Sequence, residues 1–167
     1  ISNTQDNGSY DVIIVGAGPA GLSAAINAQK SNLHYVLLEK SDHLADTIYC
    51  YPKGKPVMAE PSVIPVMGDM WMEPASREAV LDRWQEIAGK FQIRINFNQD
   101  VSEIKKQADG SLTVKSANGD LFTARKVIYA AGTQGSPNSL RPSGRAPGED
   151  LPQVFNRLKD PALFVGR

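Results

Sequence analysis

Three glycines that directly follow an apolar run are the residues of this chain with the clearest chemical potential. The run is Val12 to Val15, and the glycines follow in the spacing G-x-G-x-x-G, at Gly16, Gly18 and Gly21. Gly16 permits a tight turn, Gly18 lets the backbone approach a pyrophosphate, and Gly21 lets the next helix pack closely on the strand. Free N–H groups at the start of that helix favour phosphate.

A carboxylate at the end of the next apolar run supports the same interpretation. Apolar residues repeat at helical spacing from Leu22 onward, and the run Tyr35 to Leu38 then ends at Glu39. This strand–loop–helix–strand order places Glu39 at the tip of the second strand, where it can accept both hydroxyls of an adenosine ribose. Because a carboxylate repels a 2'-phosphate, we expect this site to hold FAD or NAD rather than NADP.

The composition argues against several other classes of protein. The 18 basic and 18 acidic residues cancel, so we expect neither nucleic acid nor an anionic membrane as a partner. No apolar run is long enough for a membrane span, and the first nine residues lack the features of a signal peptide. Cys50 is the only cysteine, which excludes a disulfide framework, a Cys-x-x-Cys pair and a cysteine-rich metal site within this sequence. We therefore expect a cytoplasmic protein without a metal.

The segment from Lys40 to Ala75 is long and contains five prolines. Segments of this length usually carry function. Aromatic and methionine side chains in it are suited to wrap a flat apolar ligand such as a flavin ring, and the alternative is a loop with its own hydrophobic cluster. These side chains are Tyr49, Tyr51, Met58, Met67, Met70, Trp71 and Met72.

Helix and strand signals alternate in the second half of the chain. Ser76 is a predicted N-cap for a helix that ends near Gly89 and places Trp84 in the core. The residues after it predict strands, with Asp-Gly and Asn-Gly turns that form a three-stranded meander leading into a final strand. The predicted strands are Phe91–Phe97, Val101–Gln107, Ser111–Ser116, Leu121–Ala124 and Lys126–Ala130.

Small residues follow the last of these strands. Ala131 and Gly132 imply that a ligand approaches the backbone closely, and the carboxyl end of a parallel strand faces the ligand crevice.

These features together resemble the flavoprotein oxidoreductases with two dinucleotide-binding domains, and the thioredoxin-reductase-like enzymes are the nearest group. The resemblance rests on the glycine loop, Glu39, the meander used as a crossover, Ala130–Gly132 and Pro147–Asp150. Within this group, Asp46–Pro52 resembles a loop of the bacillithiol disulfide reductase-like branch. The implied fold is α/β: a Rossmann-like FAD-binding domain with a central parallel sheet and a three-stranded antiparallel β-meander crossover.

The resemblance also implies roles for individual residues. The glycine loop surrounds the FAD pyrophosphate, Glu39 holds the ribose, and the backbone of Val101 reads the adenine. Asp46 and Thr47 lie near the flavin. The cofactor-binding residues expected in full are Gly16, Ala17, Gly18, Pro19, Ala20, Gly21, Glu39, Lys40, Asp46, Thr47, Val101, Ala131 and Gly132.

Two departures from the family pattern affect the expected function. Ala20 stands where the bacillithiol disulfide reductase-like proteins carry a cysteine, and an alanine methyl cannot attack a disulfide. Cys50 is a redox candidate, with a buried small hydrophobe as the alternative. The second departure is the absence of a second glycine loop and of a later Gly-Asp motif. We therefore expect an arm at 1–10, the first segment of an FAD-binding domain at 11–150, and at 151–167 a connector toward a nicotinamide-binding domain.

The favoured hypothesis is an FAD-dependent oxidoreductase that passes electrons from NAD(P)H through flavin to an unknown acceptor, with a homodimer as the full-length form. No catalytic side chain is assigned, and His34 and His43, which lack an evident carboxylate partner, are interpreted as solvated or structural. A flavin- or nucleotide-binding regulatory module without turnover is one alternative. A simple NAD-dependent dehydrogenase is another.

Overall fold

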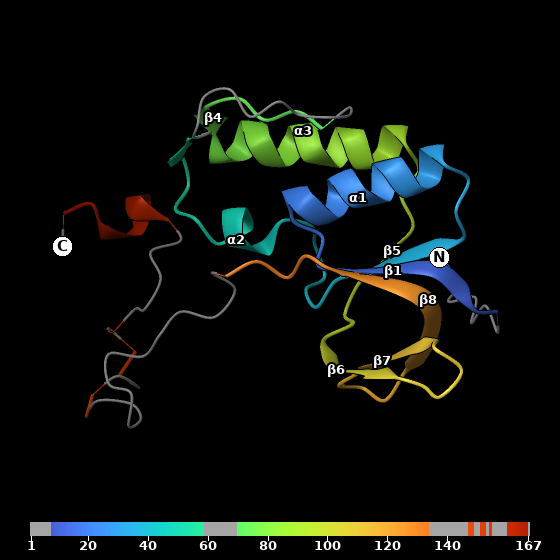
Figure 1. Ribbon diagram of the computed structural model, residues 1–167. Coiled ribbons are helices and arrows are strands. Elements are labelled where there is room, and N and C mark those ends of the chain that lie inside the picture. Colours follow the sequence, from blue (N-terminus) through green and yellow to red (C-terminus); the bar gives the residue numbers. More distant parts are fainter. Residues whose placement is uncertain are drawn as a thin grey trace.

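Two helices and a mixed sheet form the layers of this fold. A computed structural model describes residues 8–58, 70–133, 147–148, 151–152, 154 and 160–166. Within these residues, the main sheet has the strand order β5-β2-β1-β8-β7-β6. Helices α1 (Pro19–Lys30) and α3 (Arg77–Lys90) lie side by side above the sheet (Figure 1). The predicted α/β fold class is confirmed.

The two parallel strands at Tyr10–Val15 and Tyr35–Leu38 are buried on both faces, as their continuous apolar runs predict. In the first strand, Val12 and Ile14 pack toward the helices, whereas Ile13 and Val15 pack toward the meander. Successive side chains of a strand point to opposite faces, so a strand covered on both sides needs apolar residues at every position. The parallel half of the sheet contains β1 (Tyr10–Val15), β2 (Tyr35–Leu38), β5 (Ile95–Asn96) and the second part of β8 (Leu121–Tyr129), whose end is exposed.

Helix α3 begins and packs as its sequence predicts. The Ser76 hydroxyl accepts a hydrogen bond from the backbone N–H of Ala79 at 3.2 Å, which caps the helix start. Trp84 is buried, and its indole N–H donates to the carbonyl of Trp71 at 2.9 Å. The predicted core position of Trp84 is confirmed.

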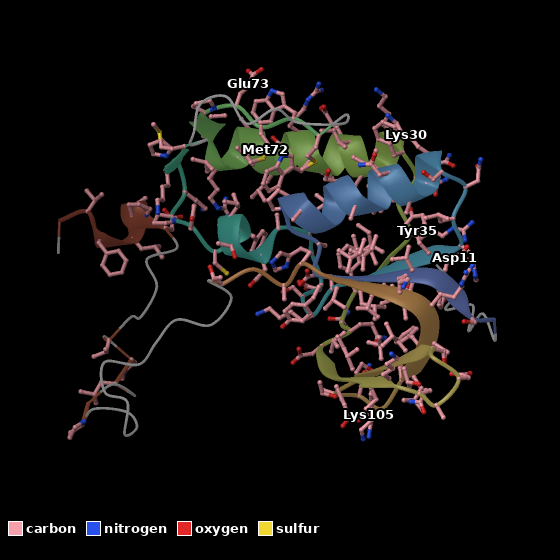
Figure 2. All side chains as sticks on the ribbon, in the orientation of Figure 1. Asp11, Lys30, Tyr35, Met72, Glu73 and Lys105 are labelled. Carbon is pink, nitrogen blue, oxygen red and sulfur yellow. The ribbon has the colours of Figure 1, made fainter. Side chains whose placement is uncertain are left out.

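The meander is also present as predicted. It consists of β6 (Val101–Lys106), β7 (Leu112–Ser116) and β8, paired antiparallel. Its turns place Gly110 at φ +87° and Gly119 at φ +96°, the left-handed region that the Asp-Gly and Asn-Gly pairs supply readily. Lys105 points away from the helices, at the far side of the molecule (Figure 2).

The prediction of two separate strands over Leu121–Ala124 and Lys126–Ala130 is wrong. One continuous strand, β8, covers this region. Ala124 pairs with Leu112 of β7 on one side and with Tyr10 of β1 on the other, so the strand passes from the meander into the parallel sheet without a turn.

The prediction of a strand over Phe91–Phe97 is too long, because the strand β5 covers only Ile95–Asn96. The backbone N–H of Phe91 still donates to Ile87, and Gln92 adopts φ +49°, so this part closes the helix. The alternating apolar side chains arise because Phe91, Ile93 and Ile95 all pack against the core beneath α1 and α3.

The long segment after β2 contains short elements that its sequence did not predict. They are α2 (Asp46–Tyr49), β3 (Pro56–Val57) and β4 (Ala75–Ser76). Met67 lies outside the described residues. A short 3-10 helix (Pro161–Phe164) is joined to this segment by an ion pair of 2.6 Å between Lys53 and Asp160. Among the described residues, no helix is both long and apolar enough to cross a membrane.

Candidate functional site

The glycine loop has the tight geometry that its spacing predicts. Gly16 adopts φ +102°, and a Cβ atom there would lie 2.5 Å from the carbonyl oxygen of Ala130. A Cβ atom on Gly21 would lie 1.8 Å from the carbonyl oxygen of Gly16. These two positions therefore require glycine for the protein's own packing, and they bring the start of α1 against the ends of β1 and β8.

Gly18 differs from its two neighbours, because a Cβ atom there would meet nothing within 4 Å. Gly18 is the N-cap of α1 with extended backbone angles, and no side chain caps the helix start. Pro19 occupies the first turn, where a missing N–H costs nothing. The free space above Gly18 is therefore the side from which an anionic group can reach the N-terminus of α1.

A cavity of about 230 Å³ opens at this point. The N-terminus of α1, helix α2 and the end of β8 converge on the same side of the molecule (Figure 1). This is the carboxyl edge of the parallel sheet, where open α/β folds bind ligands. The cavity is lined by Gly16, Gly18, Pro19, Ala20, Glu39, Lys40, Ala45, Asp46, Thr47, Ile48, Ala130, Ala131 and Gly132.

Glu39 connects the tip of β2 to the glycine loop. Its side chain is only 5 % exposed. Oε2 accepts a hydrogen bond from the backbone N–H of Ala17 at 2.7 Å, and Oε1 accepts one from Ser41 at 2.9 Å. Since a carboxylate has about four acceptor sites, two bonds leave capacity for the hydroxyls of a ribose.

Asp46 is a second carboxylate among the residues that line the cavity. Its Oδ1 lies 3.2 Å from Nε2 of His43 and accepts a hydrogen bond from the Cys50 thiol at 3.5 Å, and its Oδ2 lies 3.9 Å from the Lys40 ammonium. The Nδ1 atom of His43 lies 2.6 Å from Oδ1 of Asp42, and this hydrogen bond lowers the pKa of the Asp42 carboxyl. The sequence-based interpretation of His43 as lacking a carboxylate partner is therefore wrong.

The second histidine lies elsewhere. The ring of His34 stacks on Tyr10 with 4.6 Å between the centroids, and its backbone N–H donates to Asp11 at 3.0 Å. These contacts are at the opposite end of β2 from Glu39, which agrees with the structural interpretation of His34.

A second hollow of about 340 Å³, with aromatic and methionine side chains in its lining, adjoins the cavity. The two share Pro19, Thr47, Ile48 and Gly132. Only some of the aromatic and methionine side chains predicted to wrap a flavin line this hollow. Met70 is instead buried in the core, and Tyr49 is exposed. Those that line the hollow are Tyr51, Met58, Trp71 and Met72, together with Trp84.

Most of the residues predicted at the site line the cavity. Ala17 and Gly21 are buried in the loop beneath it. Val101 does not line it, although the backbone N–H of Gln99, two residues earlier, donates to the Glu39 carbonyl at 2.8 Å. The adenine contact of Val101 stays a prediction. The lining residues that the sequence did not predict are Ala45, Ile48 and Ala130, each of which is next to a predicted one.

The described residues fit an adenine dinucleotide with a flat apolar extension. An open glycine at the helix N-terminus suits a pyrophosphate, the buried carboxylate suits a ribose, and the neighbouring aromatic hollow suits a flavin ring.

Comparison with known proteins gives a consistent family. The family described as pyridine nucleotide-disulphide oxidoreductase matches residues 13–164. A ferredoxin–NADP reductase of Albidiferax ferrireducens is 30% identical over 174 residues, with 99% of this chain and 44% of the relative covered. A bacilliredoxin reductase of Bacillus subtilis is 28% identical over 152 residues, with 89% of this chain and 45% of the relative covered. The chain thus spans less than half the length of these relatives.

Solved structures show the same likeness. A bacillithiol disulfide reductase from Staphylococcus aureus superposes with a TM-score of 0.71 and 27% identity, with 90% of this chain and 46% of that chain covered. A flavin monooxygenase from Stenotrophomonas maltophilia superposes with a TM-score of 0.65 and 26% identity, with 78% of this chain and 41% of that chain covered.

Proposed function

We propose that this chain, which belongs to the pyridine nucleotide-disulphide oxidoreductase family, supplies the FAD-binding segment of an FAD-dependent NAD(P)H oxidoreductase. The observation that carries the proposal is the cavity at the carboxyl edge of the parallel sheet, which gathers Gly18, the N-terminus of α1 and Glu39. The names of the relatives, with their reference to NADP and to reductase activity, support it.

Each part of the site has a binding task in this proposal. The N-terminus of α1 holds the pyrophosphate, because no side chain caps it and the space beside its N-cap Gly18 is open. Glu39 holds the ribose with the acceptor capacity that its two backbone bonds leave. The hollow lined by Trp71 and Met72 excludes water from the flavin ring. When bound, FAD supplies the capacity to accept a hydride from a nicotinamide and to pass the electrons on.

The electron acceptor differs among the named relatives. Two of the named proteins are reductases of bacilliredoxin or of bacillithiol disulfide, whereas another is a ferredoxin–NADP reductase. Ala20 lines the cavity and has no sulfur, and Cys50 donates its thiol hydrogen to Asp46. We therefore favour an acceptor that can be reduced without a cysteine of this chain. An iron–sulfur protein, which accepts one electron at a time, is such an acceptor.

The decisive experiment uses the full-length protein. The cofactor of the purified protein is released by denaturation and identified by mass, and the loaded protein is mixed anaerobically with NADPH or NADH while the flavin absorbance is followed. Bound FAD that either nicotinamide reduces quickly supports the proposal. Bound FAD that is reduced no faster than free FAD would instead favour a regulatory module. Bound NAD, or no uptake of added FAD, would contradict the FAD-binding role.

Two further proposals concern the setting of the full-length protein. A cytoplasmic location is supported by the single cysteine, because a disulfide framework is typical of exported proteins. We also propose that the full-length protein is a homodimer. The balanced charge supports the proposal that neither nucleic acid nor a membrane is a partner. Light scattering of the full-length protein measures the oligomeric state.

A further inference from the structure

The side chain of Arg77, the first residue of α3, is joined to Tyr49, the last residue of α2. Its Nη2 and Nε atoms both donate to the backbone carbonyl of Tyr49, at 2.6 Å and 3.1 Å. The guanidinium also lies 5.3 Å from the centroid of the Tyr49 ring. Because the last carbonyls of a helix have no partner within the helix, these two bonds cap the C-terminus of α2.

Glu78 holds the guanidinium in this orientation. Its Oε1 accepts a hydrogen bond from Nη1 of Arg77 at 2.9 Å, and its two carboxylate oxygens accept from the backbone N–H of Gly54 at 3.3 Å and 3.2 Å. The backbone N–H of Arg77 donates to the carbonyl of Lys55 at 2.9 Å. The Arg77 side chain is only 15% exposed. The start of α3 is therefore bonded to the end of α2 and to the segment that follows it.

Helix α2 needs such bonds because it has only four residues. A helix of this length is not stable by itself in water. Its other end is bonded to the glycine loop, where the backbone N–H of Ala45 donates to the carbonyl of Ala17 at 3.0 Å. Figure 1 shows α2 beside the start of α1 and below the start of α3. The glycine loop thus holds the first end of α2, and Arg77 holds the second.

The residues of α2 lie where the cavity meets the aromatic hollow. Thr47 and Ile48 line both the cavity and the hollow, together with Pro19 and Gly132. Arg77 lines neither of them. An effect of Arg77 on a ligand in the hollow must therefore pass through α2.

We infer that Arg77 is a positioning residue for the flavin half of the cofactor. In the proposed function, the pyrophosphate and the ribose lie at Gly18 and Glu39, whereas the flavin ring lies in the hollow beyond Thr47 and Ile48. Loss of the Arg77 bonds frees the second end of α2, so the passage to the hollow loses its shape while the phosphate and ribose contacts stay. This inference rests on the proposed function.

The first test examines the hold on α2 without any cofactor. Arg77→Met keeps a long apolar stem and removes every donor, and hydrogen exchange is measured over residues 46–51 of the full-length apoprotein. We expect this segment to exchange about 10-fold faster than in the wild type, because α2 opens more often. Arg83→Met is the matched control, since Arg83 belongs to the same helix, is 54% exposed and pairs with Glu86 at 3.1 Å. Equal exchange in the wild type and Arg77→Met would overturn the proposal.

The second test compares FAD with ADP, which has the same adenosine and pyrophosphate but no flavin. Titration calorimetry of the full-length apoprotein measures both affinities. In Arg77→Met we expect the FAD affinity to fall about 10-fold and the ADP affinity to stay within about 2-fold of the wild type. Arg77→Lys, which offers one ammonium in place of the guanidinium fork, should have an intermediate FAD affinity. Arg83→Met should bind both ligands as the wild type does.

The two ligands distinguish this role from general support of the fold. Equal losses of FAD and ADP affinity in Arg77→Met would show that Arg77 supports the whole site and not the flavin half. An unchanged FAD affinity would show that it supports neither. Both results overturn this inference and leave the proposed function standing, because the wild type binds FAD in each case. If the wild-type protein takes up no FAD, the proposed function itself fails, and the exchange test still decides whether Arg77 holds α2.

Discussion

The backbone N–H of Ala17 donates a hydrogen bond of 2.7 Å to the buried carboxylate of Glu39. This bond ties the glycine loop to the tip of the second strand, across 22 positions of the sequence. Glu39 therefore has a task in the folded protein before any cofactor binds. The carboxylate that is predicted to hold the ribose also holds the loop that is predicted to surround the pyrophosphate, so the two parts of the site are fixed relative to each other.

Replacement of Glu39 is expected to have two separable effects. In Glu39→Ala, the buried N–H of Ala17 loses its acceptor, and we expect the free energy of unfolding of the apoprotein to fall by about 1–3 kcal/mol. FAD affinity should fall further, because the charge-assisted bonds to the ribose are also lost. Denaturant titration of the apoprotein and FAD titration of the full-length protein measure the two effects. Glu39→Gln, which keeps an acceptor for Ala17, should retain more stability than Glu39→Ala. Equal FAD affinity in wild type and Glu39→Ala would remove Glu39 from the site.

Gly18 and Gly21 should respond in opposite ways to added side chains. Gly18→Val puts a branched side chain into open space at a position with φ −78°, which valine adopts without strain. We expect the variant to fold and to lose FAD, because the side chain fills the space of the pyrophosphate. Circular dichroism and the flavin content of the purified full-length variant check both expectations. Normal FAD content in this variant would show that the pyrophosphate lies elsewhere.

The matched comparison is Gly21→Ala, the smallest possible addition. Its Cβ atom would lie 1.8 Å from the carbonyl oxygen of Gly16, so the start of α1 must move. We expect a loss of about 3 kcal/mol in the free energy of unfolding of the apoprotein. A smaller loss of stability in Gly21→Ala than in Gly18→Val would contradict the interpretation that Gly21 serves packing and Gly18 serves cofactor binding.

The parts of the fold that follow from local patterns were predictable from the sequence. The apolar run at Val12–Val15, the glycine spacing and the Asn-Gly and Asp-Gly turns each depend on neighbouring residues only. The length of β8 could not be predicted from local patterns, because Ala124 pairs with strands from two distant parts of the chain. No break in the sequence marks this change of partner. The strand predicted from Phe91 was too long, because the end of a helix and the alternation of a strand both place apolar residues at these positions.

The candidate site also has a part that could be predicted from the sequence and a part that could not. The glycine loop and Glu39 were assigned from a spacing that the phosphate and ribose chemistry requires. The contact of His43 with Asp46 was missed because Asp46 belongs to α2, which the sequence did not predict and whose N-cap Ala45 adopts φ +56° within a proline-rich segment. A signal was present, since Asp42 is adjacent to His43 in the sequence and Asp46 follows three positions later.

Both tryptophans of the sequence line the hollow beside the cavity, which gives an optical test of where the flavin ring lies. We expect FAD to quench the fluorescence of these two tryptophans when it binds to the full-length protein. Trp84→Phe leaves Trp71 as the reporter in this chain, and it should still be quenched. The Gly18→Val variant should show no quenching at the same FAD concentration. Stoichiometric FAD binding without quenching of Trp71 would place the ring outside this hollow.

Tyr35 should make the protein sensitive to alkaline pH. Its side chain lies between α1 and the strands (Figure 2), burial raises its pKa, and its hydroxyl oxygen accepts a hydrogen bond from the backbone N–H of Arg94 at 3.3 Å. Both folded and unfolded chains keep the tyrosine proton below about pH 10, so the stability from this group is complete there. Above that pH the unfolded chain releases its proton first, and the free energy of unfolding should fall as the pH rises toward the folded pKa.

The variants Tyr35→Phe and Tyr129→Phe separate this effect from general alkaline unfolding. Tyr35→Phe should lose about 1 kcal/mol near neutral pH, because the hydrogen bond from Arg94 is gone, but its stability should fall less steeply above about pH 10. Tyr129 is 70% exposed, so Tyr129→Phe should follow the wild-type profile. Urea titrations of the apoprotein across this pH range give both curves. A Tyr35→Phe curve as steep as that of the wild type would mean that another group, and not this buried hydroxyl, causes the loss of stability at alkaline pH.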